Sequence, residues 1–144
     1  IQFSMQCPDS QKKEICNFFD KLSVKYELRN FFDEFIQKLY ESDVLITRAG
    51  AGTVNDVILT KTPAIFIPLP SSASNHQFYN ANFLKQKKAA LLIEQKDLNS
   101  QESLSKVIEL ISNIKKQNEL IKNLKKIKSF DTNQLIFQYL NEKK

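Results

Sequence analysis

The residues best suited to chemistry lie in the stretch DVLITRAGAGTVND, residues 43–56. An apolar run typical of a buried strand leads into a turn that holds Gly50 and Gly52, the two glycines of the whole sequence. A helix is expected to begin directly after this turn. Small residues let a ligand approach the backbone, and the unpaired amides of a first helical turn favour a negative charge. The stretch therefore predicts a site for an anion.

Two polar side chains near this turn would extend such a site. The Thr53 hydroxyl could donate to a phosphate oxygen, and the Asp56 carboxylate is placed to accept from a pair of ribose hydroxyls. The field of a helix end contributes only about 0.3–1 kcal/mol, so amide hydrogen bonds must supply the rest. Alternatively, the glycines make a tight turn, Thr53 caps the helix and Asp56 is solvated. Because the pattern is neither GxGxxG nor a Walker loop, nucleotide binding does not follow from it alone.

A second polar cluster lies in PLPSSASNHQFYNA, residues 68–81, after the next strand-like run. Adjacent parallel strands end at one edge of a sheet, so this loop should emerge beside the glycine turn and form a crevice with it. His76, Gln77 and Asn80 lie within about one helical turn and offer the paired donors and acceptors that sugar hydroxyls need. The alternative is an ordinary polar helix start.

These segments must be positioned by alternating strands and helices. Hydrophobic periodicity predicts strands at 1–6, 24–28, 44–47, 64–67 and 90–93, with helices at 10–22, 33–41, 51–60 and 75–86. We expect Asp9 or Ser10 to cap the first helix. The alternation indicates an α/β fold with a Rossmann-like parallel sheet and flanking helices. After residue 93 only helices are expected, including one at 133–141. An apolar stripe formed by Leu104, Val107, Ile108 and Ile111 is expected to dock on the sheet or on a neighbouring domain.

Length and composition set broad limits. The sequence has 144 residues and 42% hydrophobic content, which suits one soluble domain, and it holds no apolar run long enough to span a bilayer. Cys7 and Cys16 match no metal or redox motif, so reduced structural thiols are expected. The net charge of +5 favours anionic partners, but dispersed basic residues without a recognition motif argue against nucleic acid. A cytoplasmic protein is expected.

The segments RAGAGTVND, PLPSSASNHQFYNA and AALLIEQKDL together resemble the MurG family, in glycosyltransferase family 28. Upstream, SMQCPDSQ and RNFFDEFIQKLYESD look like the alphaproteobacterial branch of that family. The resemblance covers residue 1 to the helix after residue 98, whereas the tail from about residue 115 matches only in helical character. It implies the C-terminal, UDP-N-acetylglucosamine-binding domain of a GT-B glycosyltransferase, which adds N-acetylglucosamine to lipid I to form lipid II.

By position in the family's motifs, Phe32 would offer its backbone to the uracil. The amides and small side chains of Ala51, Gly52 and Thr53 would meet the diphosphate and the sugar. Asp56 stands where the family has glutamate for the ribose hydroxyls, so the carboxylate is kept but is one methylene shorter.

Gln77 and Asn80 match the family's Q-x-x-N pattern and would contact the sugar hydroxyls, with His76 beside them. Arg48 matches the arginine that precedes the glycine turn at Gly50. The resemblance leaves open whether Arg48 touches the ligand or supports the loop.

Two parts of the family pattern are not found: a GGSQGA-type phosphate loop after the domain's first strand, and the N-terminal acceptor domain with its proposed base. We therefore interpret residues 1–144 as a single truncated donor-binding domain without catalytic residues, which should not turn over alone. The resemblance further implies inverting transfer to a lipid-linked acceptor, peripheral attachment at the cytoplasmic face of the inner membrane, and no tightly bound metal or cofactor.

Two other functions remain open. The chain could be a stand-alone donor-binding subunit of a two-subunit UDP-N-acetylglucosamine transferase, or an α/β interaction module without a ligand. The basic residues of the tail could approach anionic lipid, although a solvated helical face explains them as well; they are Lys115, Lys116, Lys122, Lys125, Lys126 and Lys128.

Overall fold

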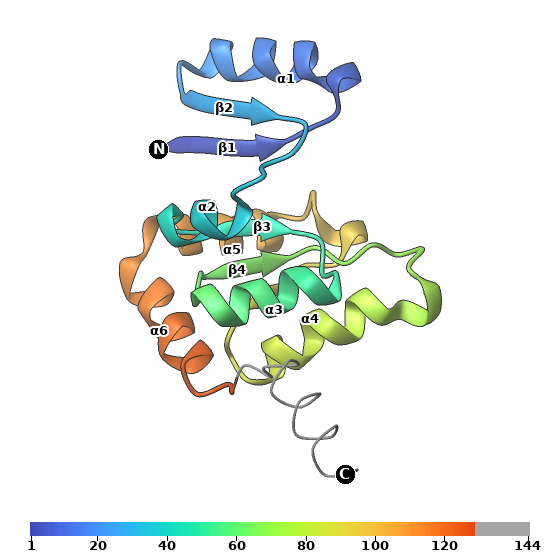
Figure 1. Ribbon diagram of the computed structural model, residues 1–144, viewed down its shortest axis with the longest axis vertical. Coiled ribbons are helices and arrows are strands. Elements are labelled where there is room, and N and C mark those ends of the chain that lie inside the picture. Colours follow the sequence, from blue (N-terminus) through green and yellow to red (C-terminus); the bar gives the residue numbers. More distant parts are fainter. Residues whose placement is uncertain (129–144) are drawn as a thin grey trace, which may run out of the picture. The chain divides into compact units, whose positions relative to one another are not determined.

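A computed structural model describes residues 1–128, with the side chain of Ala73 left out (Figure 1). The described residues contain five strands, all in parallel pairings, with helices between them. The described residues divide into two compact units, residues 1–38 and residues 39–128. The expectation of one domain over residues 1–144 stays a prediction.

The first unit consists of two parallel strands connected by a helix. Strands β1 (Gln2–Gln6) and β2 (Lys25–Arg29) pair with Gln2 opposite Lys25, and α1 (Asp9–Leu22) links them. The ring of Phe19 on α1 is buried and stacks on Phe3 of β1, at 5.2 Å between centroids, and on Tyr26 of β2, at 5.1 Å. This aromatic stack fixes α1 on the strand pair.

The predicted cap of α1 is wrong. The helix already includes Asp9, and Pro8 occupies the N-cap position without a side-chain hydrogen bond. The carboxylate of Asp9 instead pairs with Lys12 at 2.7 Å and accepts from Asn30 at 2.8 Å. Proline suits this helix start because its missing N–H would have been unpaired there.

The second unit is built on a three-stranded parallel sheet in the order β3-β4-β5, with strands Leu45–Thr47, Ala64–Phe66 and Leu91–Leu92. Helices α3 (Ala51–Thr60) and α4 (His76–Gln86) follow β3 and β4, and the 3-10 turns η1 (Ala73–Asn75) and η2 (Gln95–Asp97) precede α4 and α5. Helices α5 (Gln101–Ser112) and α6 (Ile114–Leu124) complete the unit, while α2 (Phe35–Glu41) spans the division between the two units.

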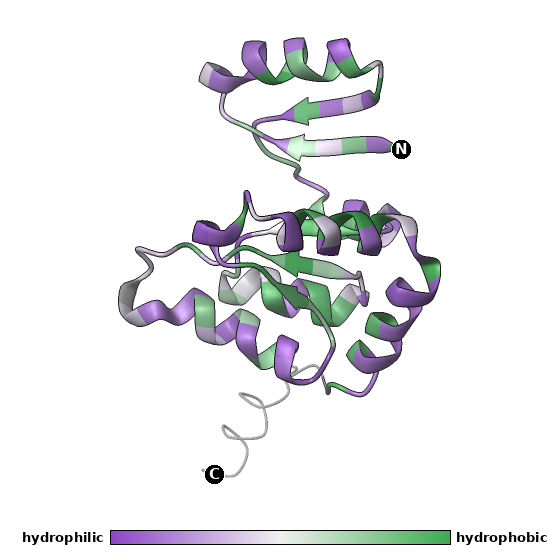
Figure 2. Cartoon of the chain, turned by 180° about the vertical axis from the view of Figure 1, so that it is seen from behind, coloured by the Kyte–Doolittle hydropathy of each residue, from purple (hydrophilic) through white to green (hydrophobic). Residues whose placement is uncertain are grey.

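The core of the second unit surrounds its central strand. All three residues of β4 are fully buried, as are Val57 of α3, Leu84 of α4, Leu110 of α5 and Leu124 of α6. Figure 2 shows the strands of this unit mainly in hydrophobic colours and its helices in a mixture of hydrophobic and hydrophilic ones. Because β4 packs on both faces, it holds the ends of β3 and β5 in fixed positions.

The predicted α/β class, the parallel strands and the flanking helices are confirmed. The five predicted strands and four helices correspond to β1–β5 and α1–α4, although the strands form two sheets. The predicted stripe on α5 is only partly buried, because Leu104 and Ile108 are exposed. The helix predicted at 133–141 lies outside the described residues. Within residues 1–128, no helix is long and apolar enough to cross a membrane.

Candidate functional site

The glycine turn and the polar loop emerge side by side from one edge of the sheet. Strands β3 and β4 are parallel neighbours, and the Ile67 amide donates to the Thr47 carbonyl at 2.8 Å where both strands end. The turn after Thr47 therefore starts beside the loop after Ile67. The predicted convergence of these two segments is observed, and we call residues 48–56 and 76–80 together the candidate site.

Helix α3 begins with unpaired amides. Gly50 is its N-cap and has no side chain to cap with, and the first intrahelical bond runs from the Val54 amide to the Gly50 carbonyl at 3.0 Å. The amides of Ala51, Gly52 and Thr53 precede that bond, so the helix itself provides them with no acceptor. This end of α3 can therefore hold an anionic group by main-chain hydrogen bonds.

The two glycines are not required by the turn itself. Gly50 has φ −60° and ψ 148°, which any residue adopts, and neither glycine has a positive φ. A Cβ at Gly52 would meet no atom within 4 Å, and one at Gly50 would meet only the Thr53 hydroxyl, at 4.0 Å. These backbone angles do not support the alternative that Gly50 and Gly52 are present to make a tight turn. Open space beside the unpaired amides is what a bound anion would need.

Thr53 and Asp56 lie on the first two turns of α3. Since Gly50 occupies the N-cap position, Thr53 does not cap the helix by its side chain. Asp56 is half-buried and lies beyond the first turn, so it is not a solvated first-turn carboxylate. Burial raises the pKa of the Asp56 carboxyl above its ordinary value. A carboxylate that has lost some water gains more from accepting ligand hydroxyls.

Arg48 connects the loops that follow three adjacent strands. Its Nη1 atom lies 3.1 Å from the Ile67 carbonyl, 3.4 Å from the Pro68 carbonyl and 2.8 Å from Gln95 Oε1. These contacts show that Arg48 supports the carboxyl edge of the sheet, whereas a ligand contact by Arg48 stays a prediction. The sequence interpretation missed Gln95. This residue follows β5, and it could have been found because adjacent parallel strands end at the same edge of a sheet.

Gln77 and Asn80 are each anchored at one end. Gln77 Oε1 accepts from the Leu69 amide at 3.0 Å, and Asn80 Nδ2 donates to the Ala49 carbonyl at 3.1 Å. Each amide side chain therefore keeps one polar atom, Nε2 of Gln77 and Oδ1 of Asn80, for a ligand. His76 is exposed at the first position of α4. The structure thus brings Asn80 to the glycine turn and Gln77 to the loop after β4, and the contacts of all three residues with a sugar stay predictions.

The loop before α4 contains a second feature that the sequence did not reveal. Ser74 and Asn75 both have left-handed backbones, with φ 47° and 56°. The Ser72 hydroxyl oxygen is buried and has no hydrogen-bond partner among the described residues. Strain and an unpaired buried hydroxyl are uncommon in loops that serve only as connections.

Phe32 belongs to the first unit, where its side chain is structural. The ring is 4% exposed, with the Arg29 guanidinium 5.4 Å and the Lys38 ammonium 5.6 Å from its centroid. Lys38 also pairs with Glu27 at 2.7 Å, and the salt bridges lower the pKa of that carboxyl. These contacts fix the backbone around Phe32. The predicted backbone contact with uracil stays a prediction.

Residues 1–128 contain no group of three or more histidine, cysteine or acidic residues that could hold a metal. The candidate site contains main-chain amides, hydroxyls, carboxamides and one carboxylate, together with the Arg48 guanidinium and the His76 imidazole.

Comparisons with known proteins match this chain along almost its whole length. The family model described as glycosyltransferase family 28 C-terminal domain matches residues 1–135. Two Rickettsia proteins, from R. akari and R. felis, are 46% and 43% identical over 118 residues, which is 82% of this chain. Both are named UDP-N-acetylglucosamine--N-acetylmuramyl-(pentapeptide) pyrophosphoryl-undecaprenol N-acetylglucosamine transferase. The chain spans only 31% and 32% of their lengths.

Solved structures show the same fold. The crystal structure of Acinetobacter baumannii MurG superposes with a TM-score of 0.83 at 24% identity, over 95% of this chain and 42% of that one. The glycosyltransferase VinC superposes with a TM-score of 0.67 at 18% identity, over 85% of this chain and 29% of that one. These structures share the fold, and the family match over residues 1–135 shows that the chain belongs to glycosyltransferase family 28, as the C-terminal domain of that family.

Proposed function

We propose that this chain binds UDP-N-acetylglucosamine as the donor half of the transferase that makes lipid II from lipid I. The observation that carries the proposal is the start of α3, where unpaired amides lie beside open space at both glycines. A diphosphate fits this arrangement, because main-chain donors and the helix dipole both favour negative charge. The names of the Rickettsia relatives supply the sugar nucleotide and the acceptor.

In this proposal, different groups of the chain bind different parts of the donor. The α3 amides and Thr53 hold the diphosphate, Asp56 accepts from the ribose hydroxyls, and Gln77 with Asn80 contacts the sugar. Phe32 offers its backbone to the uracil. Because Gln77 and Asn80 are held at one end by the protein, their remaining polar atoms are oriented before the sugar arrives.

The reaction we propose for the whole transferase is inverting. An acceptor hydroxyl forms a bond to the anomeric carbon, the bond from that carbon to the UDP oxygen breaks, and the hydroxyl proton passes to a base. The α3 amides stabilise the charge that develops on the departing UDP, so no tightly bound metal is needed. A lipid-linked acceptor requires the whole protein to work at the cytoplasmic face of the membrane, attached peripherally.

Calorimetric titration of this chain with UDP-N-acetylglucosamine, UDP-glucose and UDP-galactose tests the proposal. We expect weak binding that favours the first sugar nucleotide, is unchanged by EDTA, and is reduced in Asp56→Ala and Gln77→Ala. Gln86→Ala is the matched control, because Gln86 is an exposed glutamine of the same helix that lies outside the candidate site. Equal affinity for all three nucleotides would remove the sugar specificity, and no binding of any would remove the donor site.

A further inference from the structure

A pocket lies near the end of α4, away from the candidate site at the start of that helix. It has a volume of about 390 Å³ and is lined by Phe83, Lys87, Asn123, Lys126, Ile127 and Lys128; we call it the lysine-rich pocket. A helix rises about 1.5 Å per residue, so Phe83 and Lys87 lie roughly 10–16 Å along α4 from His76. The volume falls within the range of about 300–1,000 Å³ seen for small-molecule sites. The pocket is therefore separate from the candidate site.

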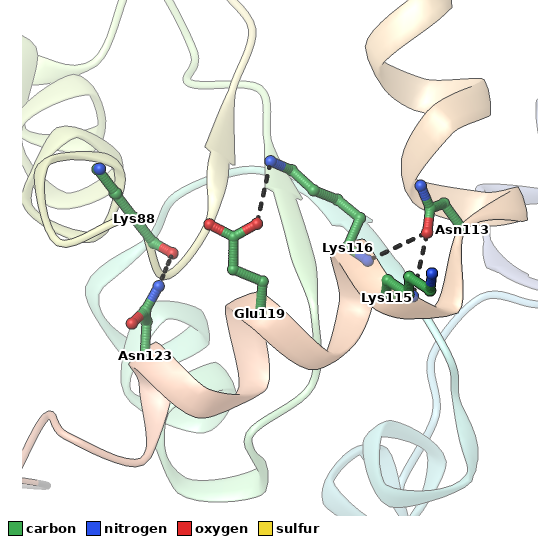
Figure 3. A network of polar contacts seen from close by, with 6 residues as sticks. All are labelled: Lys88, Asn113, Lys115, Lys116, Glu119 and Asn123. Atoms are coloured by element: carbon green, nitrogen blue, oxygen red, sulfur yellow. Dashed lines mark hydrogen bonds and ion pairs between the residues drawn. The ribbon is translucent and has the colours of Figure 1, made fainter.

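The walls of the pocket are held together by specific contacts. Asn123 on α6 donates to the Lys88 carbonyl, at 2.9 Å, in the turn after α4, as Figure 3 shows. The Lys126 ammonium donates to Asn123 Oδ1 at 3.0 Å, and Leu124 beside it is fully buried in the core. The end of α6 is thus fixed against the end of α4 before any ligand binds.

The residues that line the pocket include three lysines and no acidic residue, while the nearby Glu119 is paired with Lys116. Residues 82–93 and 120–128 contain seven lysines and no aspartate or glutamate. All seven are exposed, and in the described part of the chain none forms a salt bridge; they are Lys85, Lys87, Lys88, Lys122, Lys125, Lys126 and Lys128. The ends of α4 and α6 contribute only about half a negative charge each. The local field therefore attracts anions.

The pocket also offers apolar surface next to these cations. Phe83 is 45% exposed, and the Lys87 ammonium lies 5.0 Å from its ring centroid. Ile127 adds an aliphatic side chain to the same lining. A ligand that joins an anionic group to a flat apolar group would use both surfaces at once. Three lysine side chains present several N–H donors to a multiply charged oxyanion, which favours a phosphate over a single carboxylate.

We propose that the lysine-rich pocket is a second binding site, which takes a phosphate ester carrying an apolar group. Lys87, Lys126 and Lys128 bind the phosphate, and Phe83 with Ile127 contacts the apolar part. A free phosphorylated compound and a phospholipid headgroup share this chemistry. The site is independent of the donor site at α3.

The test is an amide-resolved NMR titration of the whole 144-residue chain with phenyl phosphate, with UDP-N-acetylglucosamine in excess. We expect shifts at Phe83, Lys87, Asn123 and Ile127 that the sugar nucleotide does not suppress. Shifts confined to residues 50–53, or none at the pocket, would overturn the proposal. The donor site has its own readout, because UDP-N-acetylglucosamine alone should shift residues 50–53 whether or not the pocket binds.

Variants separate a built pocket from general charge attraction. The triple change Lys87→Ala, Lys126→Ala, Lys128→Ala should weaken phenyl phosphate binding at least tenfold. A control with the same loss of charge replaces three exposed lysines of the first unit, Lys13, Lys21 and Lys25, and should stay within twofold. Equal weakening in both triples would show general attraction and overturn the proposal.

A second variant and a vesicle assay identify the apolar contact and the source of the phosphate. Phe83→Ala should weaken phenyl phosphate several-fold and leave inorganic phosphate unchanged; equal effects on both would refute the apolar contact. Vesicles of phosphatidic acid, whose headgroup is a phosphate monoester, and phosphatidylcholine are then sedimented with the chain. Loss of vesicle binding in the pocket triple alone supports a lipid headgroup, and unchanged vesicle behaviour with phenyl phosphate bound supports a free ligand.

Discussion

Helices α3 and α4 follow neighbouring parallel strands, yet they begin in different ways. Only residues 48–50 separate β3 from α3, and Gly50 starts the helix in an ordinary extended conformation. By contrast, residues 67–75 separate β4 from α4, and that loop ends in the left-handed residues Ser74 and Asn75. The short connection exposes main-chain amides, whereas the long one positions side chains.

This difference assigns separate tasks to the two helix starts. The α3 amides can bind any anion of suitable size, so they provide affinity without much selectivity. Gln77 and Asn80 of α4 each use one polar atom on the protein backbone and keep the other for a ligand. Selectivity among sugars should therefore depend on α4 and its loop. Changes at α3 should affect all nucleotides alike, and the following predictions use that contrast.

The largest effect is expected from a negative charge at the start of α3. Gly52→Asp should weaken both UDP and UDP-N-acetylglucosamine by at least about 100-fold, because like charges brought together cost several kcal/mol. The fold should tolerate the change, since a Cβ at Gly52 meets no neighbour and an acidic residue suits a first turn. Calorimetry measures the binding, and urea unfolding checks the stability.

Gly52→Ala is the control for this charge effect. It should raise the free energy of unfolding by about 0.5–1 kcal/mol, because alanine favours helix more than glycine does, and should weaken binding less than aspartate. Undiminished binding in Gly52→Asp would show that the α3 amides do not face the diphosphate.

The next effect concerns Arg48, which connects the two helix starts with the loop after β5. Arg48→Lys keeps the charge but cannot reach two carbonyls and Gln95 together, so we expect about a tenfold loss of donor affinity. The free energy of unfolding should fall by about 1 kcal/mol, because the contact is exposed to water. Urea unfolding and calorimetry measure the two quantities.

Gln95→Leu shows whether the loss of donor affinity in Arg48→Lys comes from a lost loop support or from a lost ligand contact. If Arg48 acts by supporting the loops, removing its Gln95 partner should weaken donor binding in the same direction, while Gln95→Glu, which keeps an acceptor oxygen, should not. Full affinity in Gln95→Leu combined with a large loss in Arg48→Lys would instead indicate that Arg48 touches the ligand.

The short connection could be predicted from sequence and the long one could not. Gly50, the apolar run before it and Pro63 after the helix are local signals. They placed β3 and α3 within one residue of the observed bounds. The polar cluster was located, but the strained backbone at Ser74 and Asn75 and the unpaired Ser72 hydroxyl depend on contacts distant in sequence. Local patterns do not contain that information.

The same limit applies to packing and pairing. The stripe on α5 predicted burial of Ile108, which is 65% exposed, while the polar Gln117 on α6 is buried and donates to the Leu110 carbonyl at 2.9 Å. Periodicity shows which residues share a helix face but not which neighbour covers that face. Likewise, the strand patterns predicted parallel pairing but not the separation into two sheets.

A smaller effect tests the selectivity assigned to α4. Gln77→Ala should weaken UDP-N-acetylglucosamine by about five- to tenfold, the value of about one hydrogen bond, and leave UDP within twofold. Calorimetry measures the loss of affinity for each ligand, and the test compares the two losses. An equal loss for both would mean that Gln77 acts only by holding the loop through Leu69.

The smallest effect concerns Asp56, where stability and binding should change in opposite directions. Burial raises the pKa of this carboxyl in the folded state, so its ionised form destabilises the fold at any pH above the unfolded pKa. Asp56→Asn should therefore raise the free energy of unfolding at pH 7, by no more than about 0.5 kcal/mol because the group is only partly buried, and give no gain near pH 3. Donor affinity should nevertheless fall, since the amide replaces one acceptor oxygen by a donor. In the unsubstituted chain, affinity should decline as the pH drops through the raised pKa. A variant that is more stable at pH 7 yet binds UDP-N-acetylglucosamine as tightly as before would contradict the ribose contact.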